Sequence, residues 1–283
     1  MKINRDKCNK MLDEWDDIVW SSSRVSEYLN CPLSWYLTYV EGIRESNYFA
    51  YTGSAVHEVH EDFYKYLLAG GVELDIDTVR KTFVKKFLRL QAKNPHFPPY
   101  MMKATDAFSV MESVNVDSWA WEPKYKDVVL SMNGDSKIIK SLLNFNVDPK
   151  ITHIERELFF EVRGHKFRGF LDYEKGDFWH GDIKSTYKKD YLNQQYLYME
   201  AKSQNQEKRP HGFEILEYKN NMNVVKFDYY EAQMKDTLSQ VGETIEKIKK
   251  ALRVGKFPVN SKSKFYCSQL CRKTDCVHSG NKR

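Results

Sequence analysis

Two carboxylates and a lysine are the residues whose types and spacing first suggest chemistry. Asp172 ends one predicted strand, Asp182 lies in the next, and Lys184 follows two residues later. Because side chains alternate along a strand, Asp182 and Lys184 point to the same face of the sheet. A turn around Gly176 would fold the second strand back beside the first and bring the two carboxylates together.

This arrangement suits metal-dependent hydrolysis of phosphodiester bonds. Carboxylate oxygens are hard ligands that hold Mg²⁺ or Mn²⁺ and leave the ion part of its water. A nearby ammonium group can orient the attacking water or neutralise charge on the phosphoryl oxygens. An Asp-x-Lys triplet also occurs by chance in many proteins, so its weight depends on the sequence around it.

The elements that would position these residues are strands. Residues 154–162, 166–173 and 178–185 are rich in aromatic and β-branched residues, and Gly164 and Gly176 occupy the expected turns. Further along the chain, the pattern predicts a helix over 191–202, strands over 213–218 and 224–229, and a long helix with an apolar core stripe over 231–253.

The region before the strands is expected to be helical. Ser21 to Ser23 are good helix N-caps, and Pro32 suits the first turn of a second helix that follows Cys31. A third helix is expected to open at 52–54 and to end at Gly70-Gly71. Residues 72–150 hold mixed helical patterns, which we interpret as a helical insertion without recognisable chemistry.

The motifs around the two carboxylates resemble those of a known family. Residues 169–172 and 181–186, followed by Gln194 and Tyr198, resemble the PD-(D/E)XK nuclease superfamily and, more closely, its RecB-type exonuclease branch. The resemblance implies an α/β fold with a restriction-endonuclease-like central mixed sheet flanked by helices. It also implies that the catalytic residues are Asp172, Asp182, Lys184, Gln194 and Tyr198. Gln195 is an adjacent alternative to Gln194.

An upstream histidine fits the same family. Residues 53–57 match its upstream motif, in which a helix histidine completes the metal shell. The implied ligands of Mg²⁺ or Mn²⁺ are His57, Asp172, Asp182 and the backbone carbonyl of Ile183. His60, on the next turn, is a competitor. The two histidines are three residues apart rather than four, so the spacing of a zinc protease motif is not met.

The five cysteines form an odd set that does not suggest a disulfide framework. Cys267, Cys271 and Cys276 are clustered, and Cys31 lies far upstream. Four thiolates are enough for a [4Fe-4S] cluster or a Cys₄ zinc site, and the alternative is unrelated thiols in a tail. Cys8 has no partner in the pattern and is expected to be an ordinary thiol.

The cysteine pattern resembles that of RecB-type nucleases with an iron-sulfur staple, such as the CRISPR-associated exonucleases and the AddB nuclease domain. That resemblance implies a [4Fe-4S] cluster in preference to zinc, bound where the two chain ends form a helical bundle. The family usually places two and then five residues between the last cysteines, whereas this chain has three and then four. One ligand has therefore moved by a single position.

Composition bounds the remaining classes of protein. The chain has 283 residues, of which 41% are apolar and 14% aromatic, so a packed core is expected and global disorder is not. There is no run of 18 or more apolar residues and no secretory signal pattern at the N-terminus, so we expect a cytoplasmic protein with no membrane segment. The net charge of +5 permits a nucleic-acid partner without demonstrating one.

We therefore expect a single nuclease domain over 1–283, made of a cluster-bearing helical part (21–70 and 254–278), the insertion and a nuclease core (151–230). The expected activity is that of a Mg²⁺- or Mn²⁺-dependent deoxyribonuclease, an exonuclease acting on single-stranded or frayed DNA ends in repair or recombination. The alternative is a non-catalytic or zinc-stabilised DNA-binding or adaptor module. No ATP-binding glycine-rich loop is present, so any helicase would be a separate partner.

Overall fold

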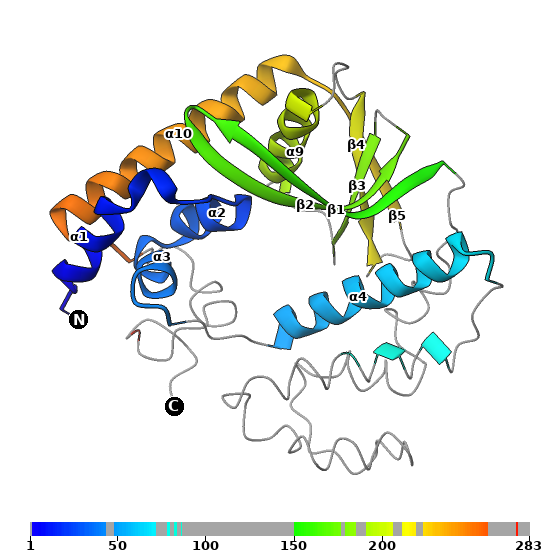
Figure 1. Cartoon of the computed structure of the whole chain (residues 1–283), viewed down its shortest axis with the longest axis horizontal. Helices are drawn as coiled ribbons and strands as arrows, with labels where there is room; N and C mark the ends of the chain where they lie inside the picture. Colours follow the sequence, from blue (N-terminus) through cyan, green and yellow to red (C-terminus); the bar gives the residue numbers. More distant parts are fainter. Residues whose placement is uncertain are drawn as a thin grey trace, which may run out of the picture.

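A five-stranded sheet with helices on both sides forms the centre of the computed structural model (Figure 1). The structure describes residues 2–43, 48–71, 78, 79, 82, 83, 86, 150–176, 179–184, 191–205, 211–218, 223–259 and 276. The insertion predicted over 72–150 therefore lies almost entirely outside the described residues. Cys267 and Cys271 also lie outside them.

The five strands follow one another across the sheet in the order of the sequence. They are β1 (Ile151–Val162), β2 (His165–Lys175), β3 (Trp179–Lys184), β4 (Gly212–Glu217) and β5 (Asn223–Asp228). Neighbouring strands are antiparallel except β3 and β4, which are parallel and are connected through helix α9 (Tyr191–Asn205). The strands predicted from the sequence are confirmed, and the sheet is mixed as expected.

Glycines make the two turns that bracket β2. Gly164 and Gly176 both adopt left-handed backbone conformations, with φ of 79° and 57°. A residue without a Cβ adopts this conformation at little cost, which allows β1, β2 and β3 to fold back on one another. These turns place Asp172 and Asp182 on adjacent strands, as the sequence predicted.

The β1–β2 hairpin extends beyond the rest of the sheet. β3 pairs with the Tyr173–Lys175 end of β2, so among the described strands the other half of β2 has no neighbour on that side. The backbone of Trp20 pairs with part of that edge. Its backbone N–H donates to the Lys166 carbonyl at 2.8 Å, and its backbone carbonyl accepts from the Arg168 N–H at 2.9 Å. The N-terminal segment is thereby attached to the strand that carries Asp172.

Helices cover both faces of the sheet. α9 and α10 (Glu231–Val254) lie on one side and α4 (Tyr48–Leu68) on the other (Figure 1). α2 (Ser22–Asn30) is capped by the Ser21 hydroxyl, which accepts from the Arg24 N–H at 3.2 Å, and α3 (Pro32–Tyr39) starts at Pro32. These starts confirm the capping interpretation, whereas α4 begins four residues earlier than Thr52, where the sequence placed it.

The first and last described helices meet in one layer. α1 (Arg5–Asp13), which the sequence analysis did not predict, lies beside α10, and the Arg5 guanidinium donates to the Leu252 carbonyl at 3.3 Å. Beyond α10, Phe257 packs on Tyr36 with ring centroids 4.7 Å apart, and the Pro258 carbonyl accepts from the Leu33 N–H at 3.3 Å. The segment that leaves α10 therefore reaches the start of α3.

Within the described part of the chain, no helix combines the length and the apolar character needed to cross a membrane.

Candidate functional site

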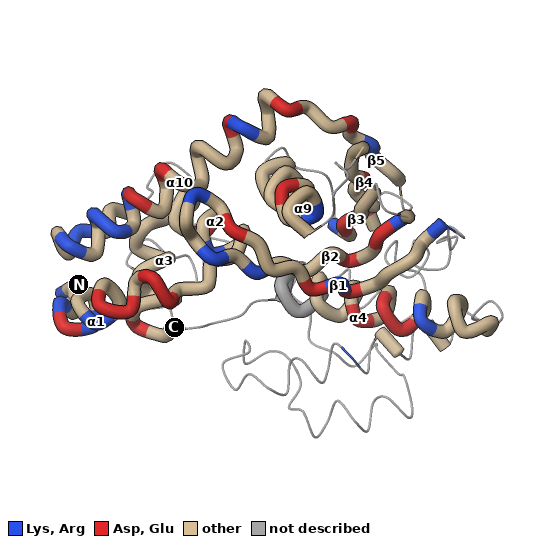
Figure 2. Tube along the Cα trace, turned by 45° about the horizontal axis from the view of Figure 1, so that its top comes forward, with Lys and Arg blue, Asp and Glu red and all other residues tan. Residues whose placement is uncertain are grey.

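Three potential ligand side chains converge where α4 faces β1 and β2. Among the described residues, atoms of His57, Glu155 and Asp172 lie within 4.8 Å of one another. His57 Nδ1 is 3.3 Å from Asp172 Oδ2. Figure 2 shows acidic positions on α4, β1 and β2 near one another. The structure thus brings together two of the predicted ligands, His57 and Asp172, and adds Glu155, which sequence reasoning missed.

Glu155 reaches this position through the register of the hairpin. The pairs Ile154 with Tyr173 and Arg156 with Leu171 place Glu155 opposite Asp172. Its backbone has a φ of 51°, in the left-handed region that residues with a side chain seldom occupy. Such conformations are concentrated at functional sites, where surrounding structure offsets their cost. A charged residue inside an expected strand was the only signal in the sequence.

Asp182 and Lys184 lie beside this trio on β3. Lys184 Nζ is 2.8 Å from each carboxylate oxygen of Asp182, and both side chains are largely buried. The Ile183 N–H donates to Asp172 Oδ2 at 2.6 Å, so the backbone between Asp182 and Lys184 is fixed against the other carboxylate. Asp182 is not a member of the trio, and its role as a ligand stays a prediction, as does that of the Ile183 carbonyl.

Burial and mutual repulsion strongly perturb the carboxyl groups. Burial raises the pKa of Asp182 to about 7, and the charge of Asp172 adds to this effect. The pKa of Glu155 is also raised to about 7, by burial and then by Asp172. For Asp172 burial also acts to raise the pKa, but the charge and hydrogen bond of His57 together with the charge of Lys184 outweigh burial and lower the pKa below its usual value. Three carboxyl groups therefore lie close together in this site, and the ionised forms of Glu155 and Asp182 are disfavoured.

Lys184 stays cationic in this environment. Burial by itself would lower its pKa, but the charges of Asp182 and Asp172 outweigh burial and raise it above the ordinary lysine value. Its ammonium group also lies 5.4 Å from the ring centroid of Tyr191 at the start of α9. A group with this pKa serves as a fixed positive charge and hydrogen-bond donor and not as a base.

Gln195 on α9 is hydrogen-bonded to the Asp182 carboxylate. Its Nε2 donates to Asp182 Oδ2 at 2.5 Å, and its Oε1 is 3.0 Å from Nε2 of His180. Burial lowers the pKa of His180 to about 3, so the imidazole is neutral and its Nε2–H donates to Gln195. Gln195 and His180 are both fully buried. They fix the orientation of the Asp182 carboxylate, and the sequence analysis named Gln195 only as an alternative.

Gln194 and Tyr198, the pair implied by the family motif, contact each other. Gln194 Nε2 donates to the Tyr198 hydroxyl at 2.8 Å, as expected for residues one turn apart. Burial, and next to it the charge of Asp182, raises the pKa of Tyr198 to about 12. Tyr198 packs over Gly169, where an added Cβ would lie 2.4 Å from the ring. The glycine lets α9 approach β2, and the catalytic roles of Gln194 and Tyr198 stay predictions.

Buried ion pairs anchor α9 to the sheet. Lys202 Nζ lies 3.1 Å from Glu174 Oε1, and Arg156 Nη1 donates to Glu174 Oε2 at 2.7 Å. Lys202 and Glu174 are both buried, so removing Glu174 would take this carboxylate away from a buried ammonium group, whereas removing Lys202 would leave Glu174 paired with Arg156. The Lys202–Glu174 pair thus attaches α9, the helix that carries Gln195, to β2.

The competing histidine does not join the site. His60 is buried on α4 and lies against the Tyr64 ring, with centroids 5.2 Å apart. Burial lowers its pKa to about 3, so it is neutral. Only His57 contributes to the three-residue group.

The donor set fits a divalent cation of the Mg²⁺ or Mn²⁺ type. One imidazole and two carboxylates form the trio, and hard oxygen donors with a single nitrogen suit these ions. Burial and the charge of Asp172 raise the pKa values of Glu155 and Asp182 to about 7, so keeping both carboxylates ionised at neutral pH requires additional positive charge. A divalent cation would supply that charge.

The cysteines are only partly described. Cys31 is buried at the start of α3, Cys276 is half-buried, and both are free thiols. Cys31 lies beside the place where Leu33 bonds to Pro258, so the C-terminal segment leaves α10 next to it. Cys267 and Cys271 lie outside the described residues, and the four-cysteine site stays a prediction.

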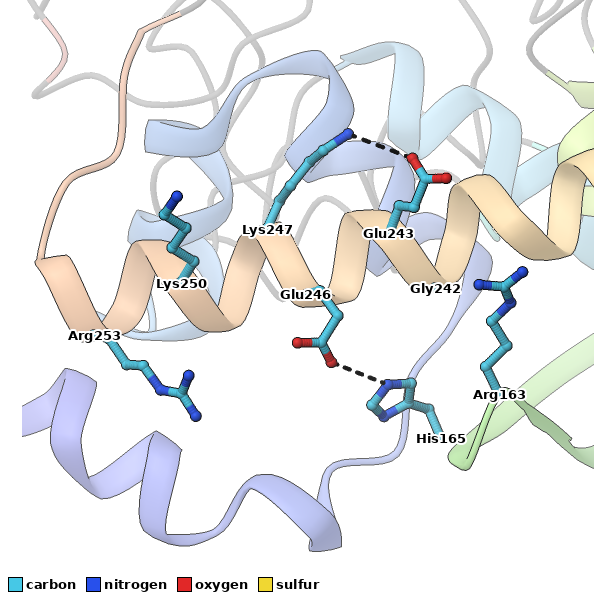
Figure 3. A pocket seen from close by; sticks show the side chains of 8 residues that line it. All are labelled: Arg163, His165, Gly242, Glu243, Glu246, Lys247, Lys250 and Arg253. Carbon is cyan, nitrogen blue, oxygen red and sulfur yellow. Dashed lines mark ion pairs between the residues drawn. The ribbon is translucent and has the colours of Figure 1, made fainter.

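A hollow of about 680 Å³ lies apart from these residues, between α10 and the tip of the β1–β2 hairpin (Figure 3). It is lined by Arg163, His165, Gly242, Glu243, Glu246, Lys247, Lys250 and Arg253. Glu243, which lies 3.9 Å from Lys247, and Glu246, which lies 4.0 Å from His165, offset part of its positive charge. None of the predicted site residues lines it.

Comparison with known proteins identifies the family. The sequence profile of the PD-(D/E)XK nuclease superfamily matches residues 19–276. Among solved structures, the chain is similar to a protein from Eubacterium rectale assigned provisionally as an exonuclease, with 12% identity, a TM-score of 0.33, and coverage of 85% of this chain and 93% of that one. No curated protein matches the sequence. Because the profile match spans most of its length, the chain belongs to the PD-(D/E)XK nuclease superfamily.

Proposed function

We propose that the protein is a metal-dependent deoxyribonuclease that hydrolyses phosphodiester bonds at the ends of DNA. The observation that carries the proposal is the convergence of His57, Glu155 and Asp172 beside the Asp182–Lys184 pair. Membership of a nuclease superfamily gives the reaction class, and the site supplies the groups that this reaction needs.

His57, Glu155 and Asp172 would hold the metal ion, with Asp182 as a further ligand. When bound, a divalent cation polarises the phosphoryl group and makes water more acidic. Lys184 would orient the attacking water, because its ammonium group is fixed by both oxygens of Asp182. Gln195 keeps Asp182 in place through its own bond to His180.

The metal requirement gives the first test. Protein stripped of metal with a chelator is expected to leave linear DNA intact. Adding Mg²⁺ or Mn²⁺ should restore digestion, and Mn²⁺ should do so at least as well as Mg²⁺. Ca²⁺ should bind to the protein without supporting digestion. Lys184→Ala should abolish digestion, and Lys235→Ala, an exposed lysine on α10, is the matched control. Full digestion by chelator-treated protein would contradict the proposal, and DNA binding without digestion in any metal would favour an adaptor module.

Digestion from an end distinguishes an exonuclease from an endonuclease. We expect the protein to degrade linear single-stranded DNA and to leave a covalently closed circle of the same sequence intact. Equal digestion of the circle and the linear strand would mean that the enzyme is an endonuclease, and the rest of the proposal would stand.

We also propose that Cys31, Cys267, Cys271 and Cys276 bind a [4Fe-4S] cluster that ties the two ends of the chain together. The contact between α3 and the segment after α10 supports this, because Pro258, which precedes the last three cysteines in the sequence, is hydrogen-bonded to Leu33, two residues from Cys31. Cys31→Ala is expected to lose iron and the broad visible absorbance of anaerobically purified protein. Cys8→Ala, another buried free thiol, should keep both. Zinc in place of iron, or iron retained by Cys31→Ala, would refute this assignment.

A further inference from the structure

We propose that two exposed aromatic side chains on the β1–β2 hairpin, Phe159 and Phe170, form with Arg168 a stacking platform for unpaired bases of a DNA strand that leads into the site. This inference rests on the proposed nuclease function and names its substrate as single-stranded DNA. Phe159 is 60% exposed and Phe170 43%, which is unusual for phenylalanine side chains within a sheet.

The three side chains form one surface. Phe159 lies directly opposite Arg168 in the register of β1 and β2, and Phe170 lies two residues beyond Arg168 on β2. The Arg168 guanidinium is 4.9 Å from the ring centroid of Phe170 and 5.9 Å from that of Phe159. Glu157 accepts a hydrogen bond from Arg168 Nε and so holds the guanidinium between the rings. We call this surface the Phe159–Arg168–Phe170 platform, and its three side chains contact one another without a ligand.

The platform is continuous with the proposed metal site. Side chains alternate along a strand, so Arg168, Phe170 and Asp172 lie on the same face of β2. Phe170 and Asp172 are two residues apart, a distance of about 7 Å at the usual rise per residue, which is on the order of one nucleotide of an extended strand. A base stacked on Phe170 would place the adjoining phosphodiester near Asp172.

The chemistry of the platform favours unpaired bases. Aromatic rings combined with an arginine plane stack on bases of any sequence, and in a duplex those base faces are occupied by neighbouring base pairs. The acidic Glu157 and Glu161 balance Arg168 and Lys166 on the same hairpin face, so phosphate contacts contribute little there. Binding at the platform should therefore depend on stacking, which is insensitive to salt, and not on counterion release.

Affinity measurements test this directly. Fluorescence anisotropy would follow binding of labelled oligodeoxythymidine and of a blunt duplex in the presence of a chelator, which removes any contribution from turnover. We expect Phe159→Ala and Phe170→Ala each to weaken the single-strand Kd about tenfold and the duplex Kd by less than about twofold. The tenfold loss should be the same at about 50 and 200 mM salt.

Two further variants keep the test decisive. Tyr230→Ala removes an aromatic side chain of equal exposure, 62%, at the start of α10 and should leave single-strand affinity unchanged. Phe170→Tyr keeps a stacking ring and should restore single-strand affinity even if Phe170→Ala folds poorly. Normal single-strand binding by folded Phe159→Ala and Phe170→Ala would overturn the inference.

Other outcomes separate this inference from the proposed function. Loss of self-association in sedimentation velocity, with unchanged DNA binding, would show that the surface joins two copies of the chain and would overturn the platform. Wild-type protein that binds the oligonucleotide as expected but digests no DNA with Mg²⁺ or Mn²⁺ would support the platform and refute the nuclease. DNA digestion by the wild-type protein, combined with normal single-strand binding by the phenylalanine variants, would support the nuclease and refute the platform.

Discussion

Replacing Gln195 with leucine should damage the protein more than the same replacement at Gln194. Gln195 makes two buried hydrogen bonds, to Asp182 at 2.5 Å and with His180 at 3.0 Å, and both partners are buried. Gln194 makes one, to the Tyr198 hydroxyl at 2.8 Å, in a part-buried position. The two residues are adjacent and identical in type, so each is the best available control for the other.

The expected magnitudes follow from those contacts. A buried hydrogen bond to a charged group contributes roughly 1.5 to 3 kcal/mol, and a neutral one about 1 kcal/mol. Gln195→Leu should therefore lower the free energy of unfolding by about 3 kcal/mol and Gln194→Leu by about 1 kcal/mol. On the scale of domains of about 150 to 250 residues, these losses correspond to decreases in Tm of about 6 to 12 °C and about 2 to 4 °C.

Thermal unfolding in chelator, followed by circular dichroism, measures both losses without a contribution from metal binding. In Mn²⁺, Gln195→Leu should also lower kcat for DNA digestion and leave KM nearly unchanged, because it disturbs the orientation of Asp182 and not the binding of DNA. A Tm decrease for Gln194→Leu that equals or exceeds the decrease for Gln195→Leu would refute the assignment of Gln195 as the residue that positions Asp182.

Two other substitutions probe the site from the metal and from the backbone. Glu155→Gln should weaken Mn²⁺ binding about tenfold in isothermal titration, because it removes one anionic ligand. The control, Glu161→Gln on the exposed face of β1, should not change Mn²⁺ binding. Equal Mn²⁺ affinities for the two variants would exclude Glu155 as a ligand. Gly181→Ala should lower the free energy of unfolding in urea by more than about 2 kcal/mol, because the new Cβ would lie 1.8 Å from the buried Tyr173 ring. Gly53→Ala is the control, because its Cβ would enter open space. An unchanged urea midpoint for Gly181→Ala would contradict the described packing.

The sequence predicted the elements of the sheet well, for a clear physical reason. Aromatic and β-branched runs on either side of Gly164 and Gly176 mark strands, and the two glycines mark the turns that end them. The five strands appear where they were expected. The family motif then located Asp172, Asp182 and Lys184 on adjacent strands. Local patterns of this kind are readable because each depends on few residues.

What the sequence missed depends on contacts between distant segments. Glu155 faces Asp172 only through the register of the hairpin and its own left-handed backbone, neither of which has a local signal. The choice between Gln194 and Gln195 depends on how α9 is rotated on the sheet, which the buried Lys202–Glu174 pair helps to set. α1 carries few apolar residues and is stabilised by its contacts with α10, so its own sequence did not reveal it.

The rate of DNA digestion by purified Asp182→Ala, measured together with its DNA affinity, tests the central claim most directly. We expect the rate to fall by at least about 10³-fold, a few kcal/mol of transition-state stabilisation, because the substitution removes a proposed ligand and the partner of Lys184. DNA affinity should stay nearly that of the wild type, because one site residue contributes little to phosphate contacts spread over a surface. Substantial digestion by a contaminant-free Asp182→Ala preparation would contradict the account.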